Sequence, residues 1–294
     1  MRFARYAWTV LAYNVAVVLW GAYVRATGSG AGCGNHWPLC NGGVTPHSSS
    51  LQALVEYTHR ASSGADLLLV GVLVYWAFRA FPRHHPVRRG AVLSAAFLLT
   101  EALLGASLVL LHHVANNASV SRVYSLSLHL TNTLALLACL ALTAWWAGGH
   151  APVRLHGRAL GTAAATLLTV VAVGITGAIA ALGDTLFPAP SLAAALAQDF
   201  DPASNAILRL RALHPALAAL AGACMLMYAI ARAVGNPRLK KLGYGVALLA
   251  AAQVGAGVLN LTLLAPVWMQ MVHLLLADLL WIALVLLCAS QEGV

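Results

Sequence analysis

Long apolar stretches, separated by short polar segments, follow one another along the whole chain. A membrane-spanning helix needs roughly 20 mostly apolar residues, and eight stretches reach that length. They lie near residues 7–24, 54–78, 91–111, 123–146, 159–182, 206–231, 242–265 and 267–288. The alternation of apolar and polar positions that marks the strands of a membrane barrel is absent. The pattern therefore predicts an all-α integral membrane protein with eight transmembrane helices.

Composition supports this prediction. Of the 294 residues, 61% are hydrophobic and only 9% are charged, whereas ordinary globular domains carry about a quarter charged residues. Water-soluble enzymes, disordered tails and disulfide-rich secreted scaffolds are thereby excluded. Arg2 and Arg5 before an apolar stretch resemble the start of a signal peptide, but Ala7 to Val24 is too long for one and seven more spans follow. We expect this segment to be retained as a helix.

The formal net charge of +9 arises mostly from Lys and Arg in short loops. Such residues set membrane orientation, and no basic face is large enough to predict binding to a nucleic acid. If the N-terminus lies inside, 12 of the 17 cations fall on the inner side, so both termini are expected in the cytoplasm. The protein is expected to cross the cell membrane several times and to be surrounded by lipid. The inner cations are Arg2, Arg5, Arg79, Arg83, Arg88, Arg89, Arg154, Arg158, Arg232, Arg238, Lys240 and Lys241.

Weak self-similarity in a shared order indicates that the chain repeats. The matching pairs are Gly21-Ala22 with Gly177-Ala178, His59-Arg60-Ala61 with His214-Pro215-Ala216, Gly105-Ala106-Ser107 with Gly255-Ala256-Gly257, and His129-Leu130 with His273-Leu274. Four helices followed by four return the second half in the same orientation. We therefore expect two pseudo-repeated four-helix bundles, residues 1–148 and 159–294, joined by a cytoplasmic linker at 149–158.

Four of the twelve histidines lie inside predicted spans, one in each even-numbered helix: His59, His129, His214 and His273. The other eight lie in loops or at helix ends. Polar groups within the membrane are costly and seldom face lipid. A single such histidine would be interpreted as a hydrogen-bonded core residue. Four at matching depth near the outer surface, two in each half, indicate two pairs of ligands.

Two facing imidazoles can hold a haem iron from opposite sides, and a four-helix bundle has room for the macrocycle. Zinc would need further Cys, Asp or Glu ligands. The sequence therefore predicts one haem site at His59 and His129 and a second at His214 and His273. Four cations near the outer ends either bind haem propionates or mark the membrane boundary; they are Arg25, Arg60, Arg209 and Arg211.

The two predicted sites differ three residues before the first histidine of each pair. Glu56 shares a helix face with His59, whereas the corresponding position before His214 is Arg211. A carboxylate beside a metal cofactor can accept protons or stabilise developing positive charge. We interpret Glu56 as the catalytic residue and the second site as a plain electron-transfer haem. The alternative is that Glu56 only pairs with Arg60.

Cys33 and Cys40 lie in the first outer loop, residues 26–53, which is expected on the oxidising side, where a disulfide should form. It either fastens the loop or exchanges electrons with the first site. Cys139, Cys224 and Cys288 lie in apolar helices as small core residues.

Some residues inside the spans are unusual for a membrane helix. Three acidic residues lie within the spans: Asp66, Glu101 and Asp278. They could conduct protons, but we favour the interpretation that they are structural residues that form hydrogen bonds. Pro215 follows His214 directly and should disturb one helical turn.

Several motifs together resemble those of the haem A synthase family. Residues 21–30 read Gly-Ala-Tyr-Val-Arg-Ala-Thr-Gly-Ser-Gly, and Cys33 and then Trp37-Pro38-Leu39-Cys40 follow. Glu56-Tyr57-Thr58-His59-Arg60 is similar to that family's Glu-x-x-His-Arg element, and the other three histidines fall where its histidines are expected. The resemblance covers essentially the whole chain. Some relatives carry a second cysteine pair in the loop at 184–205, and this chain has none there.

The resemblance implies oxidation of the C8 methyl group of haem O to a formyl group, giving haem A for terminal oxidases. Two two-electron oxidations pass through an alcohol and then a hydrate that loses water. His59 and His129 would hold the substrate or product haem beside Glu56, and His214 and His273 a permanent haem b. The counterpart of Cys33–Cys40 takes part in electron handling. The implied partners are haem O synthase as donor, cytochrome oxidase assembly as recipient, and an electron acceptor that no motif identifies.

Two other functions compete with this interpretation. A dihaem b-type electron carrier would exchange electrons and modify nothing, and a transporter would use the histidines as proton-coupled groups. The difference between Glu56 and Arg211 favours an enzyme over a carrier. The histidines gather near one face instead of the midplane, where transporters bind substrate, which argues against the transporter.

Overall fold

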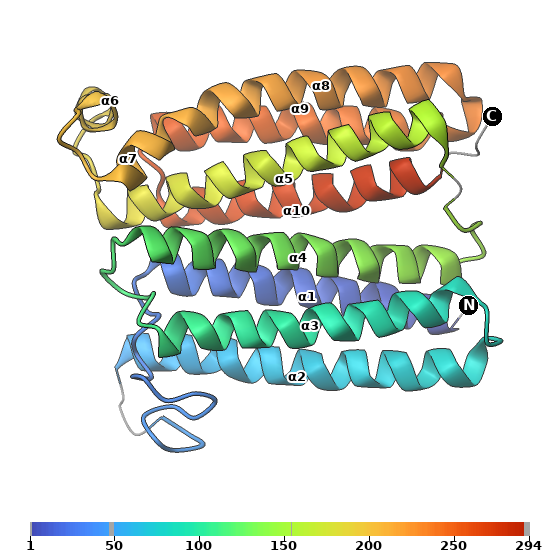
Figure 1. The fold of residues 1–294 in the computed structure, drawn as a ribbon, viewed down its shortest axis with the longest axis horizontal. Helices are drawn as coiled ribbons and strands as arrows, with labels where there is room; N and C mark the ends of the chain where they lie inside the picture. Colours follow the sequence, from blue (N-terminus) through green and yellow to red (C-terminus); the bar gives the residue numbers. More distant parts are fainter. Residues whose placement is uncertain (1, 47–49, 154, 291–294) are drawn as a thin grey trace.

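The computed structural model describes residues 2–46, 50–153 and 155–290. Within these residues, eight helical segments are long and apolar enough to cross a membrane, which confirms the predicted all-α membrane fold (Figure 1). The segments are α1 (Arg2–Ala26), α2 (Leu51–Ala80), α3 (Pro86–Leu110), α4 (Val120–Ala147), α5 (Gly157–Leu186), α7 (Ala206–Arg211) with α8 (Leu213–Gly235), η1 (Pro237–Leu239) with α9 (Lys240–Thr262), and α10 (Val267–Ala289). Arg154, one of the predicted inner cations, lies outside the described residues.

Polar caps, which hydropathy does not detect, set the first turn of several helices. The Ser50 hydroxyl accepts a hydrogen bond from the Ala53 N–H at the start of α2, and Ser119 does the same for Arg122 at the start of α4. A side-chain oxygen at this position satisfies a backbone N–H that has no partner inside the helix. Both helices consequently begin at Leu51 and Val120, earlier than the apolar stretches near 54–78 and 123–146 indicate.

The second outer loop and the sixth span differ from the prediction. The loop at 184–205 contains a short helix, α6 (Leu192–Phe200), which Ser191 caps. The sixth span is broken between α7 and α8, directly before His214. Pro215 has no N–H to donate to the carbonyl of Arg211, so one helical hydrogen bond is missing at the break. The turn that Pro215 was expected to disturb is therefore where the helix is interrupted.

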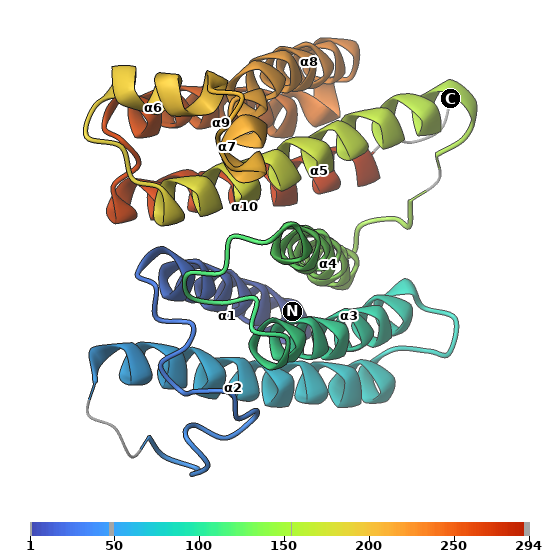
Figure 2. The same ribbon diagram turned by 60° about the vertical axis from the view of Figure 1, so that its left-hand side comes forward.

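The long helices lie side by side in two groups (Figures 1 and 2). Helices α1 to α4 form one group, and α5 with α7 to α10 forms the other, connected through the segment between Ala147 and Gly157. Both termini lie at one end of the molecule, and the first outer loop and α6 lie at the opposite end (Figure 1). The fold therefore places the two outer loops on the same side.

Helices α4 and α10 are the most buried spans, because they lie where the two groups meet. In their most apolar 18 residues, 44% of α4 and 50% of α10 is buried, against 17–33% in the other spans. Trp281 of α10 is packed in the core of the first group and donates its indole N–H to the carbonyl of Leu134 on α4, at 2.7 Å. The two groups thus share a continuous apolar core.

Candidate functional site

The four histidines singled out from the sequence lie at the same end of the molecule. Each falls within the first ten residues of its span, which corresponds to about 15 Å of helix, and all four spans begin at the end that carries the outer loops. His129 and His273 are on the central helices α4 and α10, whereas His59 and His214 are on α2 and α8. Each predicted pair therefore combines one central and one peripheral helix.

Two of these imidazoles pack directly against a glycine on another helix. A Cβ atom added to Gly21 of α1 would lie 2.9 Å from Cε1 of His59, and one added to Gly177 of α5 would lie 2.9 Å from Cε1 of His214. A Cβ atom at either distance would force the imidazole ring to shift, whereas glycine leaves room for the ring in its present position. Gly21 and Gly177 are also a matched pair in the weak repeat of the sequence.

The other two histidines have looser glycine contacts. A Cβ atom on Gly257 of α9 would lie 3.1 Å from Cε1 of His273, and one on Gly105 of α3 would lie 3.8 Å from Cε1 of His129. The second distance is an ordinary van der Waals contact. The glycine beside His273 is Gly257, not Gly255, which the sequence comparison aligned with Gly105. Every one of the four rings is thus accommodated by a glycine of a neighbouring span.

Three of the four imidazole rings have a buried nitrogen that makes no hydrogen bond with the described residues. Nδ1 of His59, His129 and His273 is buried and has no hydrogen-bond partner among the described residues. Buried polar atoms in folded proteins nearly always have one. All four rings are half-buried, so each presents a partly accessible surface beside its enclosed edge. Partly exposed imidazole rings with a nitrogen that lacks a hydrogen-bond partner are suited to bind a ligand.

The second pair has neutral polar neighbours. Nδ1 of His214 lies 3.1 Å from the hydroxyl of Thr176, which leaves Nε2 for a ligand. Nε2 of His273 lies 3.3 Å from the amide nitrogen of Gln253. Binding of iron through that nitrogen would require Gln253 to move aside.

The pairing of the four histidines expected from the sequence stays a prediction, and electrostatic interactions between the members of each pair are consistent with it. His59 lies within electrostatic range of His129, and His273 within range of His214. Within the described ranges, no three His, Cys, Asp or Glu side chains gather as a set for a metal ion. A centre that takes two protein ligands, such as haem iron, fits these pairs better than zinc, which needs three or four.

Glu56 is buried, with 3% of its surface exposed, and holds the first outer loop. Its Oε2 accepts a hydrogen bond from the Cys33 N–H at 2.8 Å, and its Oε1 accepts one from Arg60 at 2.5 Å. Arg60 also donates to the carbonyls of His36 and Leu39. The pairing with Arg60 that the sequence left as an alternative is thus present, together with a contact to the cysteine loop.

The expected disulfide between Cys33 and Cys40 is present. Both cysteines are buried, with 0% and 1% of their surface exposed. Thiol exchange with an external partner would therefore require the loop to open. Of the core cysteines, Cys288 is buried, and Cys139 and Cys224 are half-buried.

Arg211 holds the second outer loop in a comparable way. Its side chain is buried and donates to Asp199 at 2.7 Å and to Asp184 at 2.9 Å. The position three residues before the histidine thus fastens an outer loop in both halves, with opposite charge. The acidic residues of this loop are the feature of the sequence that could have indicated the contact.

The arginines considered for haem propionates are mostly engaged with the protein itself. Arg25 donates to the Ala181 carbonyl at 2.6 Å and to Gln270 at 2.9 Å, and so joins α1 to α5 and α10. Arg60 and Arg211 hold the two outer loops, and Arg209 is exposed. Arg25, Arg60 and Arg211 therefore already make hydrogen bonds within the chain.

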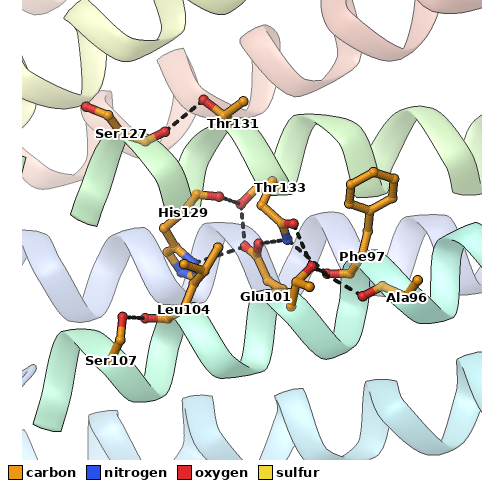
Figure 3. Close-up of polar contacts among 11 residues, drawn as sticks. Ala96, Phe97, Glu101, Leu104, Ser107, Ser127, His129, Thr131 and Thr133 are labelled. Carbon is orange, nitrogen blue, oxygen red and sulfur yellow. Dashed lines mark hydrogen bonds and ion pairs between the residues drawn. The ribbon is translucent and has the colours of Figure 1, made fainter. Parts of the chain in front are cut away.

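Glu101 is hydrogen-bonded, as the sequence analysis favoured, and it also lies beside a histidine of the first predicted pair. Its Oε2 accepts a hydrogen bond from Asn132 at 2.6 Å, its Oε1 accepts one from Thr133, and Oε1 lies 3.5 Å from Nδ1 of His129 (Figure 3). No spacing along one helix reveals this contact, because Glu101 is on α3 and its partners are on α4. Asp66, by contrast, is hydrogen-bonded to Asn14 in the buried contact between α1 and α2.

Comparison with known proteins identifies the family. A match to the cytochrome oxidase assembly proteins extends over residues 4–285, nearly the whole chain. The chain belongs to this family. It is also similar to proteins named heme A synthase, being 38% identical over 109 residues to the one from Bacillus mycoides and 37% identical over 109 residues to that of Bacillus cereus. These matches cover 37% of the chain and 35% of each relative, and they confirm the resemblance found in the motifs.

This member of the assembly-protein family is also similar to a longer protein. It is 50% identical over 293 residues to a protein of Thermus thermophilus named protoheme IX farnesyltransferase, which covers 98% of this chain and 48% of the relative. The chain thus spans about half the length of this relative.

Proposed function

We propose that the protein is a haem A synthase, an oxidoreductase that converts the C8 methyl group of haem O to a formyl group. The observation that carries this proposal is the first histidine pair, where His59 and His129 share one end of the α1–α4 group with Glu56 and the Cys33–Cys40 loop. Membership of the cytochrome oxidase assembly family and the likeness to heme A synthases support it.

In this proposal the two histidine pairs have separate roles. His59 and His129 bind the iron of haem O, the substrate, and Glu56 assists as proton acceptor or as a stabilising charge at the reacting carbon. His214 and His273 hold haem b, which supplies electron transfer when bound. The matched contacts of Gly21 with His59 and of Gly177 with His214 support the idea that residues 1–148 and 159–294 are pseudo-repeats joined at 149–158.

We further propose that the termini lie in the cytoplasm and that the histidines lie towards the outer face of the cell membrane. The excess of cations in the loops at the end that carries the termini supports this orientation. The disulfide at the opposite end supports it as well, since disulfides persist on the oxidising side of the membrane.

A protohaem IX farnesyltransferase is the proposed source of the substrate. The Thermus relative carries that name, and this chain matches 48% of it. Cytochrome oxidase assembly would then receive the product.

The experiment is to produce the chain in membranes together with a haem O-forming farnesyltransferase, purify it, and separate the extracted haems by chromatography. We expect haem b together with haem O, the alcohol intermediate and haem A. Cells with the farnesyltransferase alone serve as control and should contain no haem A. Haem b alone would support the electron carrier instead, and a haem-free protein would support the transporter.

One observation favours the dihaem electron carrier as the second candidate. Because Glu56 and Arg211 both fasten an outer loop, the difference in charge at this position is not by itself a sign of chemistry. The haem extraction separates the two candidates, since a carrier forms no haem A.

A further inference from the structure

We propose that Glu101 is a positioning residue for His129, which sets the first histidine pair apart from the second. The proposal rests on the proposed function, in which His129 binds the iron of the substrate haem. It concerns a residue on α3 that the sequence assigned to structural hydrogen bonding.

The Glu101 carboxylate is held in place by side chains of α4. Asn132 donates to Oε2 at 2.6 Å and also donates to the Phe97 carbonyl of α3 at 2.9 Å. The Thr100 hydroxyl donates to the amide oxygen of Asn132 at 2.6 Å, so that both ends of this amide are engaged. The carboxylate is therefore fastened within the contact between α3 and α4.

His129 completes the surroundings of this carboxylate. The second oxygen of Glu101 accepts a hydrogen bond from Thr133, one turn after His129, and lies 3.5 Å from Nδ1 of the ring (Figure 3). Both hydrogen-bonding partners of the carboxylate are donors, and a carboxylate has room for more than two. A small rotation of the ring brings its Nδ1–H into a hydrogen bond with Glu101. That tautomer leaves the lone pair on Nε2 for iron.

The other three histidines have no such partner in the described part of the chain. Nδ1 of His59 has no hydrogen-bond partner, His214 contacts the Thr176 hydroxyl, and His273 contacts the Gln253 amide. Hydrogen bonds to a charged acceptor are roughly twice as strong as neutral ones. A carboxylate inside a membrane span is also costly unless it is paired. Its placement beside one imidazole of the first pair indicates that this ring is held more rigidly, and is more electron-rich, than the others.

The alternative is that Glu101 only ties α3 to α4. A structural tie would affect folding and both haem sites alike. A positioning residue would affect the first site selectively and would change the electronic properties of the iron that His129 binds.

The test compares Glu101→Gln with the wild-type full chain, purified in detergent with haem b bound. Haem O is added and its affinity is measured from the Soret band. Loss of a partner to a metal-binding histidine typically weakens metal binding 10–100-fold, and we expect a loss of that size for haem O. A potentiometric titration should show the potential of bound haem O shifted upward, with the haem b potential and the melting temperature unchanged.

Two threonine variants serve as controls on the same helix. Thr133→Val keeps the carboxylate but removes the donor to Oε1 of Glu101, and it also loses a hydrogen bond to the His129 carbonyl. Oε1 then accepts more strongly from His129, so we expect a small downward shift of the haem O potential, opposite to that of Glu101→Gln, which provides a readout if Glu101→Gln fails to fold. Among the described residues, the Thr131 hydroxyl donates only to the Ser127 carbonyl of its own helix, so Thr131→Val should behave like wild type (Figure 3).

The outcomes separate the two proposals. If the wild type binds haem O and Glu101→Gln binds it equally well with the same potential, the role of Glu101 is overturned and the proposed function stands. Equal losses of haem b and haem O would identify a structural tie and overturn it as well. If the wild type binds no haem O, the proposed function fails, and the positioning role fails with it.

Discussion

The two halves of the molecule present their histidines at similar depth, each against a glycine of a neighbouring span, but they fasten different outer loops above them. In the first half, Glu56 accepts a hydrogen bond from the backbone of Cys33, within a disulfide-closed loop. In the second half, Arg211 donates to Asp184 in the last turn of α5 and to Asp199 in the last turn of α6. The same helical position therefore carries whichever charge its loop requires.

The comparison shows that the chemical difference between the two histidine pairs does not rest on Glu56 and Arg211 alone. The sequence placed it at Glu56 and Arg211, whose side chains the structure uses for fastening loops. The environments of the rings themselves differ in another respect, because Glu101 lies beside His129 whereas His214 and His273 face a hydroxyl and an amide. Both differences can be tested by matched changes in the two halves.

The largest effect is expected from removing the histidines. His59→Ala should abolish haem A formation and retain haem b, because only the first pair would lose an iron ligand. His214→Ala should remove haem b from the purified protein. Pyridine haemochrome spectra and haem chromatography measure both. Loss of haem b from His59→Ala but not from His214→Ala would reverse the assignment of the two sites.

Glu56 and Arg211, three residues before the first histidine of each pair, provide the next comparison. Glu56→Gln keeps an acceptor for Cys33 and removes the charge, so haem A formation should fall about 100-fold, the lower range for a lost general base, while haem b stays. Haem chromatography quantifies both. An unchanged yield of haem A would show that Glu56 holds the loop and has no catalytic role.

Arg211→Gln should act on stability, because it leaves Asp184 and Asp199 without their buried cation. Breaking such a pair costs about 3–5 kcal/mol, to be read as a lower melting temperature and a lower haem b content. Arg209→Gln, at an exposed neighbouring position, is the matched control and should change neither.

Substitution of the glycines should have a smaller effect on stability. Gly21→Ala and Gly177→Ala each place a methyl group 2.9 Å from an imidazole carbon, and overpacking of this kind costs about 1–3 kcal/mol. The first should weaken binding of added haem O, and the second should lower haem b content. Gly105→Ala, with 3.8 Å available, and Gly71→Ala, with no neighbour within 4 Å, should resemble wild type in both measurements. Equal effects at all four positions would show that the close contacts carry no specific role.

The smallest effect is expected from Cys33→Ser combined with Cys40→Ser. Glu56 and Arg60 still hold the loop through backbone groups, so haem A formation should decrease less than in Glu56→Gln. Arg60→Met, which removes the contacts to His36 and Leu39, should add to this loss in the double-cysteine background. Haem A yield in the combined variant measures the remaining contribution of the loop.

The sequence by itself determined the eight spans, the position of the four histidines near the start of their spans and the disulfide, because span length, hydropathy and the presence of two nearby cysteines are properties of short segments. It left helix starts such as Leu51 and the helix α6 undetected, since the caps at Ser50 and Ser191 involve only a few polar atoms. Only the tertiary structure decided that Gly21 faces His59, that Glu101 lies beside His129, and that Arg211 holds Asp184 and Asp199. Each of these contacts joins side chains of different helices or loops, and their relative rotation is set by packing across the whole bundle, which no local pattern specifies.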